Sequence, residues 1–245
     1  MKYFILTALL ATIFLEGQSQ QQFISKAKIE FEVKCNIYSH LGDDVWDQNA
    51  KDRLPKFSVN YFDYIFSENN RSIYKFNRTG NTQKIPSWYD IGSEDNVWYN
   101  DYTAGTFSDV KEMWGDTYVL KDSIPNIEWK MTNEHRTIAG FDCKKAFGKI
   151  FDSVYVFAFY TDEILISGGP MHLGGLPGMI LGVTIPRMHT SWIATTIQVN
   201  NIDEKKIVFP SKGKVNKASD VQKKIAERMK DWGNKDDWYT WRMFI

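Results

Sequence analysis

The sequence predicts a mainly β protein, a single curved antiparallel sheet that is open like a half-barrel, with a C-terminal helix. Apolar residues alternate with polar ones in many short segments, as in Ala27, Ile29, Phe31 and Val33. Aromatic residues make up 15% of the chain, and they favour strands. A convincing helical period occurs only at 221–232. Curvature is expected because so many strands occur without a second domain and are interrupted by a glycine-rich bend.

The strands follow from this alternation and from the polar turns between the segments. A hairpin is predicted across 67–70, and the charged stretch 42–55 is predicted to be a loop or a short helix. The segments predicted as strands are 27–33, 57–66, 72–76, 97–99, 106–113, 118–121, 127–130, 137–150, 153–161, 179–184, 191–199 and 205–209.

The C-terminal region carries the predicted helix. Ser219 and Asp220 can cap it, and Gly233 is suited to end it. Its apolar face is formed by Val221, Ile225, Met229 and Trp232. The apolar tail 238–245 is expected to dock on the sheet or to form an edge strand.

The N-terminus predicts export. Lys2 precedes an apolar run over 3–15, and Ser19 supplies a small residue at a cleavage point, so 1–19 is interpreted as a signal peptide. The run is shorter than the roughly 20 residues of a membrane-spanning helix, and no span is expected in the mature chain. Residues 20–245 are then one β-rich domain located in the periplasm or at the cell surface.

The charge balance and the two cysteines limit the remaining possibilities. Lys and Arg number 30, as do Asp and Glu, so no net field favours nucleic acid. In an oxidising compartment Cys35 and Cys143 form either one disulfide or two buried thiols, and the sequence leaves both open.

The common catalytic motifs are absent from the sequence. It contains no nucleophile elbow, no His-Glu-x-x-His helix, no phosphate-binding loop and no paired Cys-x-x-Cys. No catalytic residue is assigned. The sequence therefore favours a binding or accessory protein that holds a lipid, a peptide or a partner protein in the concave sheet, although a convergent active site is left open.

A glycine-rich stretch at 167–178 is the outstanding candidate site. Its structural residues are Gly169, Pro170, Gly175, Leu176, Pro177 and Gly178. Glycine and proline suit a stiff loop, which either forms a tight crossing between strands or presents a binding surface. In the second interpretation Met171, His172 and Leu173 are exposed and contact the ligand, whereas Leu176 and Pro177 pack inward.

This region resembles the GLPGLI family. Residues 175–180 read Gly-Leu-Pro-Gly-Met-Ile, with Met179 in place of the second leucine of the signature. The segments 138–146 and 159–164, and the pair Gly169-Pro170, are similar to the family's upstream pattern. The similarity spans about residues 125 to 200, and its combined spacing is more specific than a lone glycine motif.

The resemblance implies a compartment and no reaction. Proteins of this family are exported by Bacteroidota-type bacteria to the periplasm or cell surface, and an association with TonB-dependent transport systems is implied. No cofactor is implied. The unknown ligand or partner is expected to belong to the cell envelope.

Two Met-His pairs suggest an alternative function. Met171-His172 lies in the loop, and Met188-His189 follows one strand later. Imidazole and thioether ligands together suit copper. The alternative is a periplasmic copper-binding protein, but the intervening strand separates the pairs by roughly 20 Å unless the connection curls. The other interpretation is two surface histidines beside two methionines that fill the core.

Overall fold

The structure is a computed structural model that describes residues 24–86, 89, 94–113, 115–151, 153–208, 215–231 and 238–245. The predicted signal peptide, 1–19, lies outside the described residues. Among the described helices, none is long and apolar enough to cross a membrane.

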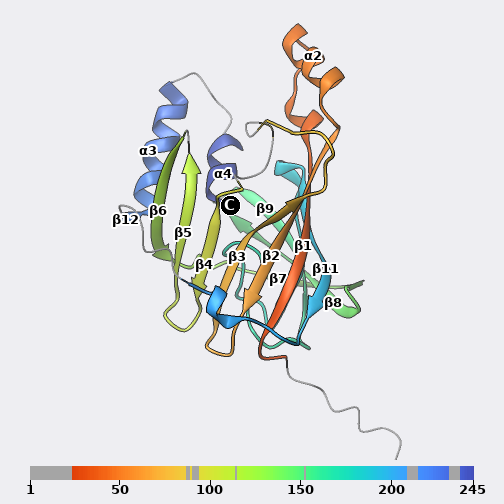
Figure 1. Cartoon of the computed structure of the whole chain (residues 1–245), viewed down its shortest axis with the longest axis vertical. Coiled ribbons are helices and arrows are strands. Elements are labelled where there is room, and N and C mark those ends of the chain that lie inside the picture. Colours follow the sequence, from red (N-terminus) through yellow and green to blue (C-terminus); the bar gives the residue numbers. More distant parts are fainter. Residues whose placement is uncertain are drawn as a thin grey trace, which may run out of the picture.

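The strands form one sheet that curves but does not close into a barrel (Figure 1). Its order is β12-β6-β5-β4-β3-β2-β1-β11-β10-β9-β8-β7. The strands are β1 (Ala27–Asn36), β2 (Phe57–Phe66), β3 (Arg71–Thr79), β4 (Val97–Asp101), β5 (Thr106–Met113), β6 (Asp116–Ser123), β7 (Lys130–Ile138), β8 (Phe141–Ile150), β9 (Val154–Thr161), β10 (Met179–Ile185), β11 (Thr190–Gln198) and β12 (Val215–Lys217). The predicted fold class is confirmed, with one exception to antiparallel pairing: β12 runs parallel to β6.

The helices lie around the open part of the sheet and at one end of it (Figure 1). They are the α-helices α2 (Val45–Arg53), α3 (Ala218–Asp231) and α4 (Trp238–Phe244) and the 3-10 helices η2 (Ile37–His40), η3 (Pro186–Met188) and η4 (Glu204–Lys206). The short helix expected within 42–55 is therefore present as α2, which buries none of its residues.

Alternation places the apolar residues of β1 on the inner face, as predicted. Ala27, Ile29, Phe31 and Val33 are buried in the main core, where they meet inner residues of the neighbouring strands such as Trp192. Burying one large apolar side chain contributes on the order of 1.5 to 3 kcal/mol. The inner face therefore supplies most of the driving force for curvature around a shared core.

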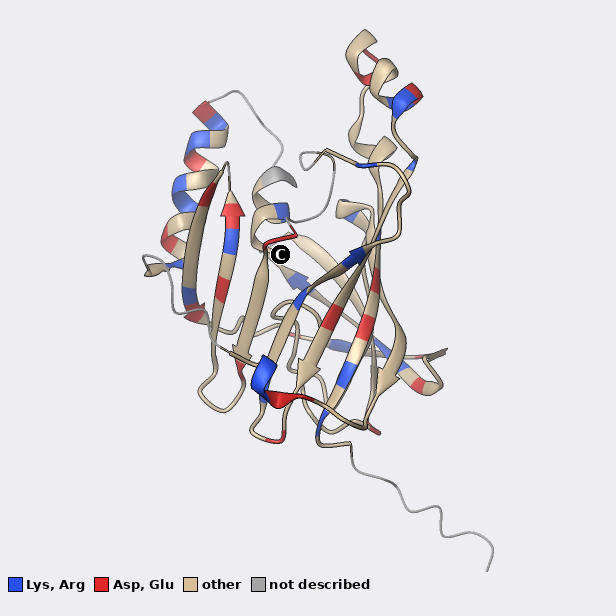
Figure 2. Ribbon diagram, in the orientation of Figure 1, with Lys and Arg blue, Asp and Glu red and all other residues tan. Residues whose placement is uncertain are grey.

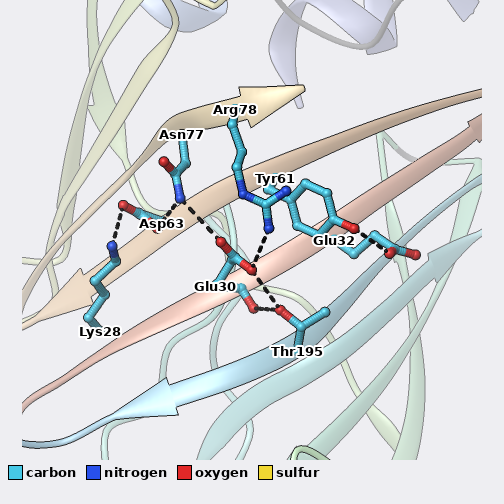
Figure 3. A network of polar contacts seen from close by, with 8 residues as sticks. All are labelled: Lys28, Glu30, Glu32, Tyr61, Asp63, Asn77, Arg78 and Thr195. Atoms are coloured by element: carbon cyan, nitrogen blue, oxygen red, sulfur yellow. Dashed lines mark hydrogen bonds and ion pairs between the residues drawn. The ribbon is translucent and has the colours of Figure 1, made fainter. Parts of the chain in front are cut away.

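The outer face of the same strands is polar and internally paired (Figure 3). Glu30 accepts hydrogen bonds from Asn77, Arg78 and Thr195, while Arg78 also stacks over the ring of Tyr61. Asn77 and Arg78 lie on β3 and reach Glu30 on β1 across the intervening β2, while Thr195 lies on the adjacent β11, so the network ties β11, β1, β2 and β3 together on the side away from the core.

Three strand predictions were wrong. Of the strand predicted at 127–130, only Lys130 lies in a strand, as the first residue of β7. The single strand predicted at 137–150 is divided between β7 and β8 by a turn at Ala139 and Gly140, which have φ values of 49° and 88°. Two consecutive residues with positive φ match the right-handed twist of a two-residue hairpin. The strand predicted at 205–209 is not found in its described part, 205–208, where η4 is present instead. The turn of η4 begins where Asp203 accepts a hydrogen bond from the amide of Lys205.

The C-terminal helices cover the region next to β6. Val221, Ile225 and Met229 of α3 are buried, as predicted, and pack in a second cluster with Phe107 and Leu120. The helix begins at Ala218, so the expected cap at Ser219 and Asp220 lies inside the first turn. Trp232 and Gly233 lie outside the described residues. The apolar tail docks as a helix, α4, and not as an edge strand.

The two cysteines are not bridged. Cys35 lies on β1 and Cys143 on β8, and three strands separate them in the sheet. A disulfide requires Cα atoms about 4.4–6.8 Å apart. Both side chains are buried in the main core, so of the two alternatives that the sequence left open the structure has the thiols.

We expect both thiols to be protected in the folded protein. Burial raises the pKa of Cys143 to about 11, so its thiol is protonated at neutral pH and reacts slowly. Iodoacetamide should leave the mass of the native protein unchanged and should add two groups in denaturant without reductant. Alkylation that appears only after reduction would contradict the structure.

Candidate functional site

The glycine-rich loop connects β9 to β10 and closes over the inner face of the sheet. Its backbone is bonded back to the sheet, because Met179 N donates to Ile164 O and Ile180 N donates to Gly168 O. Gly178 has a φ of 137°, and a Cβ there would collide with the carbonyl oxygen of Thr161. A residue with a side chain cannot adopt this position without strain, so the loop is a demanding part of the structure.

The three residues predicted to contact a ligand are buried, which corrects the expectation that they are exposed. Met171, His172 and Leu173 have exposed fractions of 2, 8 and 4%. Leu176 packs inward as expected, but Pro177 is exposed. The loop turns its large side chains toward the sheet because the gap beneath it must be filled.

His172 is held by two hydrogen bonds from opposite sides of its ring. Nδ1 lies 2.7 Å from Oδ1 of Asn100 on β4, and Nε2 lies 2.8 Å from Oδ2 of Asp109 on β5. The imidazole also stacks on Phe107, with ring centroids 3.9 Å apart. The amide of Asn100 is oriented by its own bond from Nδ2 to the Met171 carbonyl oxygen, 2.8 Å away.

Hydroxyl groups continue this polar cluster toward β2. Ser72 on β3 lies 3.3 Å from the Asn100 amide, and the hydroxyls of Tyr64 and Tyr102 are 2.9 Å apart. Burial raises the pKa of both tyrosines, so they remain neutral. Gly168 passes close above them, where a Cβ would lie 2.5 Å from the Tyr64 hydroxyl.

The geometry makes His172 a positioning residue for the loop. Both ring nitrogens are engaged, one by Asn100 Oδ1 and the other by a carboxylate oxygen of Asp109. Neither ring nitrogen is then left to accept a proton from a substrate or to bind a metal ion. The arrangement attaches the loop to β4 and β5 through a buried pair with Asp109.

Lys111 is a second buried charged group on the same face of β5. Its ammonium lies 3.8 Å from the centre of the Trp98 ring and donates to the main-chain oxygen of Ile245, 2.9 Å away. Burial lowers the pKa of Lys111 from 10.5 to about 7, and the nearby Asp109 opposes this shift. The contact connects the end of α4 to the sheet.

A cavity of about 670 Å³ lies beside this cluster, between the two ends of the open sheet. One side is formed by 125–130 and the β8–β9 hairpin, and the other by α3 and the end of α4. Met171, His172 and Leu173 contribute to its lining. We call it the seam cavity. Its volume lies within the roughly 300–1,000 Å³ of small-molecule sites.

The four residues of the copper alternative have different surroundings. His172 has both ring nitrogens engaged, Met171 and Met188 are buried in the core, and His189 is exposed beside the ring of His40. Copper binding by these residues stays a prediction, and it would require His172 to leave Asn100 or Asp109.

Sequence reasoning identified the loop but missed its partners. Asn100, Asp109 and Lys111 stand at positions that alternate with Tyr99, Ser108 and Val110, so they share the inner face with Trp98 and Phe107. A usable signal was present, because charged residues at expected core positions of a strand are unusual. Which loop would meet them could not be read from the chain.

Comparisons with known proteins agree with the fold. A family model described as the N-terminal domain of an N-glycanase peptide matches residues 106–223, from β5 into α3. Two solved structures of PNGF-II, in space groups C2 and P21, superimpose with TM-scores of 0.52 and 0.52 at 17 and 16% identity. Each match covers 82% of this chain and 33% of the PNGF-II chain. No curated protein sequence matches the chain. At this identity the likeness concerns the fold.

We expect His172→Ala to destabilise the protein by about 3 to 5 kcal/mol, because removing one partner leaves the buried carboxylate of Asp109 uncompensated. The matched control is His135→Ala, which removes an exposed pair with Asp142 at 3.0 Å and should cost about 0 to 1 kcal/mol. Urea unfolding of both variants measures the difference. Equal costs would show that the loop does not depend on His172.

Lys111 should make stability increase with pH. Its pKa is lower in the folded than in the unfolded chain, so between pH 7 and 10 the unfolded chain binds more protons. The free energy of unfolding should rise by roughly 1.4 kcal/mol per pH unit from this group. Urea unfolding at pH 7.5 and 9.5 should show this rise in the wild type relative to Lys111→Met. Parallel pH profiles of the two proteins would contradict it.

Proposed function

We propose that the protein is an exported, non-catalytic binding or accessory module that takes its ligand in the seam cavity. The observation that carries the proposal is the position of this cavity, in the gap where the curved sheet stays open. Open sheets and barrel mouths are common places for ligands. The cavity is also next to the glycine-rich loop, which the sequence singled out.

The lining combines aromatic rings with polar groups. Phe147, Phe151 and Tyr155 supply rings, and Glu128 and Gln222 supply hydrogen-bonding groups. Tyr155 is 49% exposed, and the ammonium of Lys149 lies 5.0 Å from the centre of its ring. A lipid chain needs a uniformly apolar lining, whereas a sugar presents apolar C–H faces to rings and hydroxyls to polar groups. This mixture favours a carbohydrate ligand.

The similarity to an N-glycanase N-terminal domain supports the same class of ligand. Together with the lining it favours the glycan of a glycoprotein or glycopeptide over the lipid, the bare peptide or the partner protein that the sequence alone left open. The hydrolytic activity in the name of the relative is not part of the proposal, because the match covers a third of that chain.

The non-catalytic role is supported by the state of His172. Its two nitrogens are engaged by Asn100 and Asp109, so no general base faces the cavity from the loop.

Charges of both signs are interspersed over α3 and the strands (Figure 2), which does not suggest a surface for nucleic acid. The proposal also includes export, a place in a Bacteroidota-type envelope and a link to TonB-dependent transport. These parts rest on the signal peptide predicted at 1–19 and on the GLPGLI resemblance of the sequence.

The proposal is tested by binding to a peptide with one N-linked glycan, compared with the same peptide after its glycan is removed and with phosphatidylcholine vesicles. We expect binding of the glycopeptide alone. Tyr155→Ala should weaken it by about tenfold, the equivalent of about 1.4 kcal/mol, without changing the melting temperature. The control is Trp46→Ala, which removes an exposed aromatic residue of α2 outside the cavity and should bind normally.

If the peptide binds equally well with and without its glycan, the ligand is the peptide and not the carbohydrate. Binding to vesicles alone would favour a lipid. If Tyr155→Ala binds the glycopeptide as well as the wild type does, the ligand lies outside the seam cavity and the proposal fails.

A further inference from the structure

Two histidines from distant parts of the sequence lie together at one end of the sheet. His40 is the last residue of η2, which follows β1, and His189 follows η3 at the start of β11. Their ring centroids are 5.2 Å apart, and the ring planes meet at 74°. Neither residue belongs to the lining of the seam cavity.

The backbone holds the pair in place. Asn36 N donates to His189 O at 3.0 Å, continuing the pairing of β1 with β11 beyond Cys35 and Thr190. His189 N in turn donates to Pro186 O at 2.9 Å. His189 has a φ of 48°, a left-handed conformation that is uncommon outside glycine.

The spacing of the rings fits two ligands of one metal ion. A coordinating nitrogen lies about 2.0–2.1 Å from Zn²⁺, and the ring centroid lies about 1.1 Å behind that nitrogen. Two imidazoles on a tetrahedral ion therefore have centroids about 5 Å apart. The ring of His189 is exposed and can turn about its side-chain bonds to direct a nitrogen at a shared ion.

A third polar group accompanies the pair. The side-chain oxygen of Asn36, Oδ1, is buried and has no hydrogen-bond partner among the described residues. A buried acceptor without a protein partner is costly, and such acceptors commonly bind an ion or a water molecule. The main chain of Asn36 is next to His189 through the backbone bond given above, so we count its amide oxygen as the candidate third ligand.

We propose that His40, His189 and the Asn36 side-chain oxygen form a binding site for a divalent transition-metal ion. Two imidazoles with one neutral oxygen suit Cu²⁺, Ni²⁺ and Zn²⁺, with Cu²⁺ the tightest of the three. The site differs from the copper site predicted from the sequence, because the structure pairs His189 with His40 and not with His172. It is independent of the ligand of the seam cavity.

The proposal is tested on the full chain without a polyhistidine tag, after treatment with chelator. Equilibrium dialysis against Cu²⁺ with elemental analysis should find one ion per chain. His40→Ala and His189→Ala should each weaken binding by about tenfold or more, because each removes one arm of a chelate. The double variant should be little weaker than either single one, since the two ligands act as a unit. Electron paramagnetic resonance should show coupling to imidazole nitrogen.

His135→Ala is the matched control. His135 is also exposed, but it pairs with Asp142 on β7 and β8, far along the sheet order from β1 and β11. This variant should bind Cu²⁺ as the wild type does. Equal losses in all three single variants would mean adventitious binding at surface histidines. The proposal is overturned by that result, by a wild type that binds no ion, or by unchanged binding in the double variant. Melting curves without metal show that each variant is folded.

Discussion

A sheet that curves around a core without closing must fill the gap between its two ends, and the rest of this structure depends on that constraint. The apolar inner face of β1, β2 and β11 would be exposed to water if the gap remained empty. Three pieces fill it: the glycine-rich loop, the helix α4 and the side of α3. The seam cavity is the space that they leave, so the candidate binding site follows from incomplete closure and not from a separate device.

The glycine-rich loop and α4, which fill the gap, are attached to the sheet by buried polar groups as well as by apolar contacts. His172 connects the loop to β4 and β5, and Lys111 connects the end of α4 to β5. Apolar packing alone tolerates sliding between surfaces, whereas hydrogen bonds to buried partners fix one arrangement. Buried charges are costly, and they are retained here at the place where the loop and α4 must take one position relative to the sheet.

The two faces of the sheet have different tasks. On the outer face, Glu30, Arg78 and their neighbours pair across strands and leave few unsatisfied charges (Figure 3). Such a network stabilises the sheet without offering a groove. The inner face holds the buried polar cluster and lines the seam cavity, and polar groups there are removed from water, so their interactions are stronger. The pair of His40 and His189 belongs to neither face. It lies at one end of the sheet, where backbone turns bring the short helices η2 and η3 together.

The sequence by itself determined the fold class, the apolar face of α3 and the importance of the glycine-rich loop, because alternation, helical period and glycine content are local properties. It could not separate β7 from β8 at Ala139 and Gly140, since a two-residue turn leaves the alternation almost unbroken. It also placed Met171, His172 and Leu173 on the surface, where loops usually lie. Only the tertiary structure decided that they face inward, because their partners Asn100 and Asp109 are more than sixty residues away along the chain. The pairing of His189 with His40 is of the same kind: contacts across a sheet depend on strand order, and strand order is not written in local pattern.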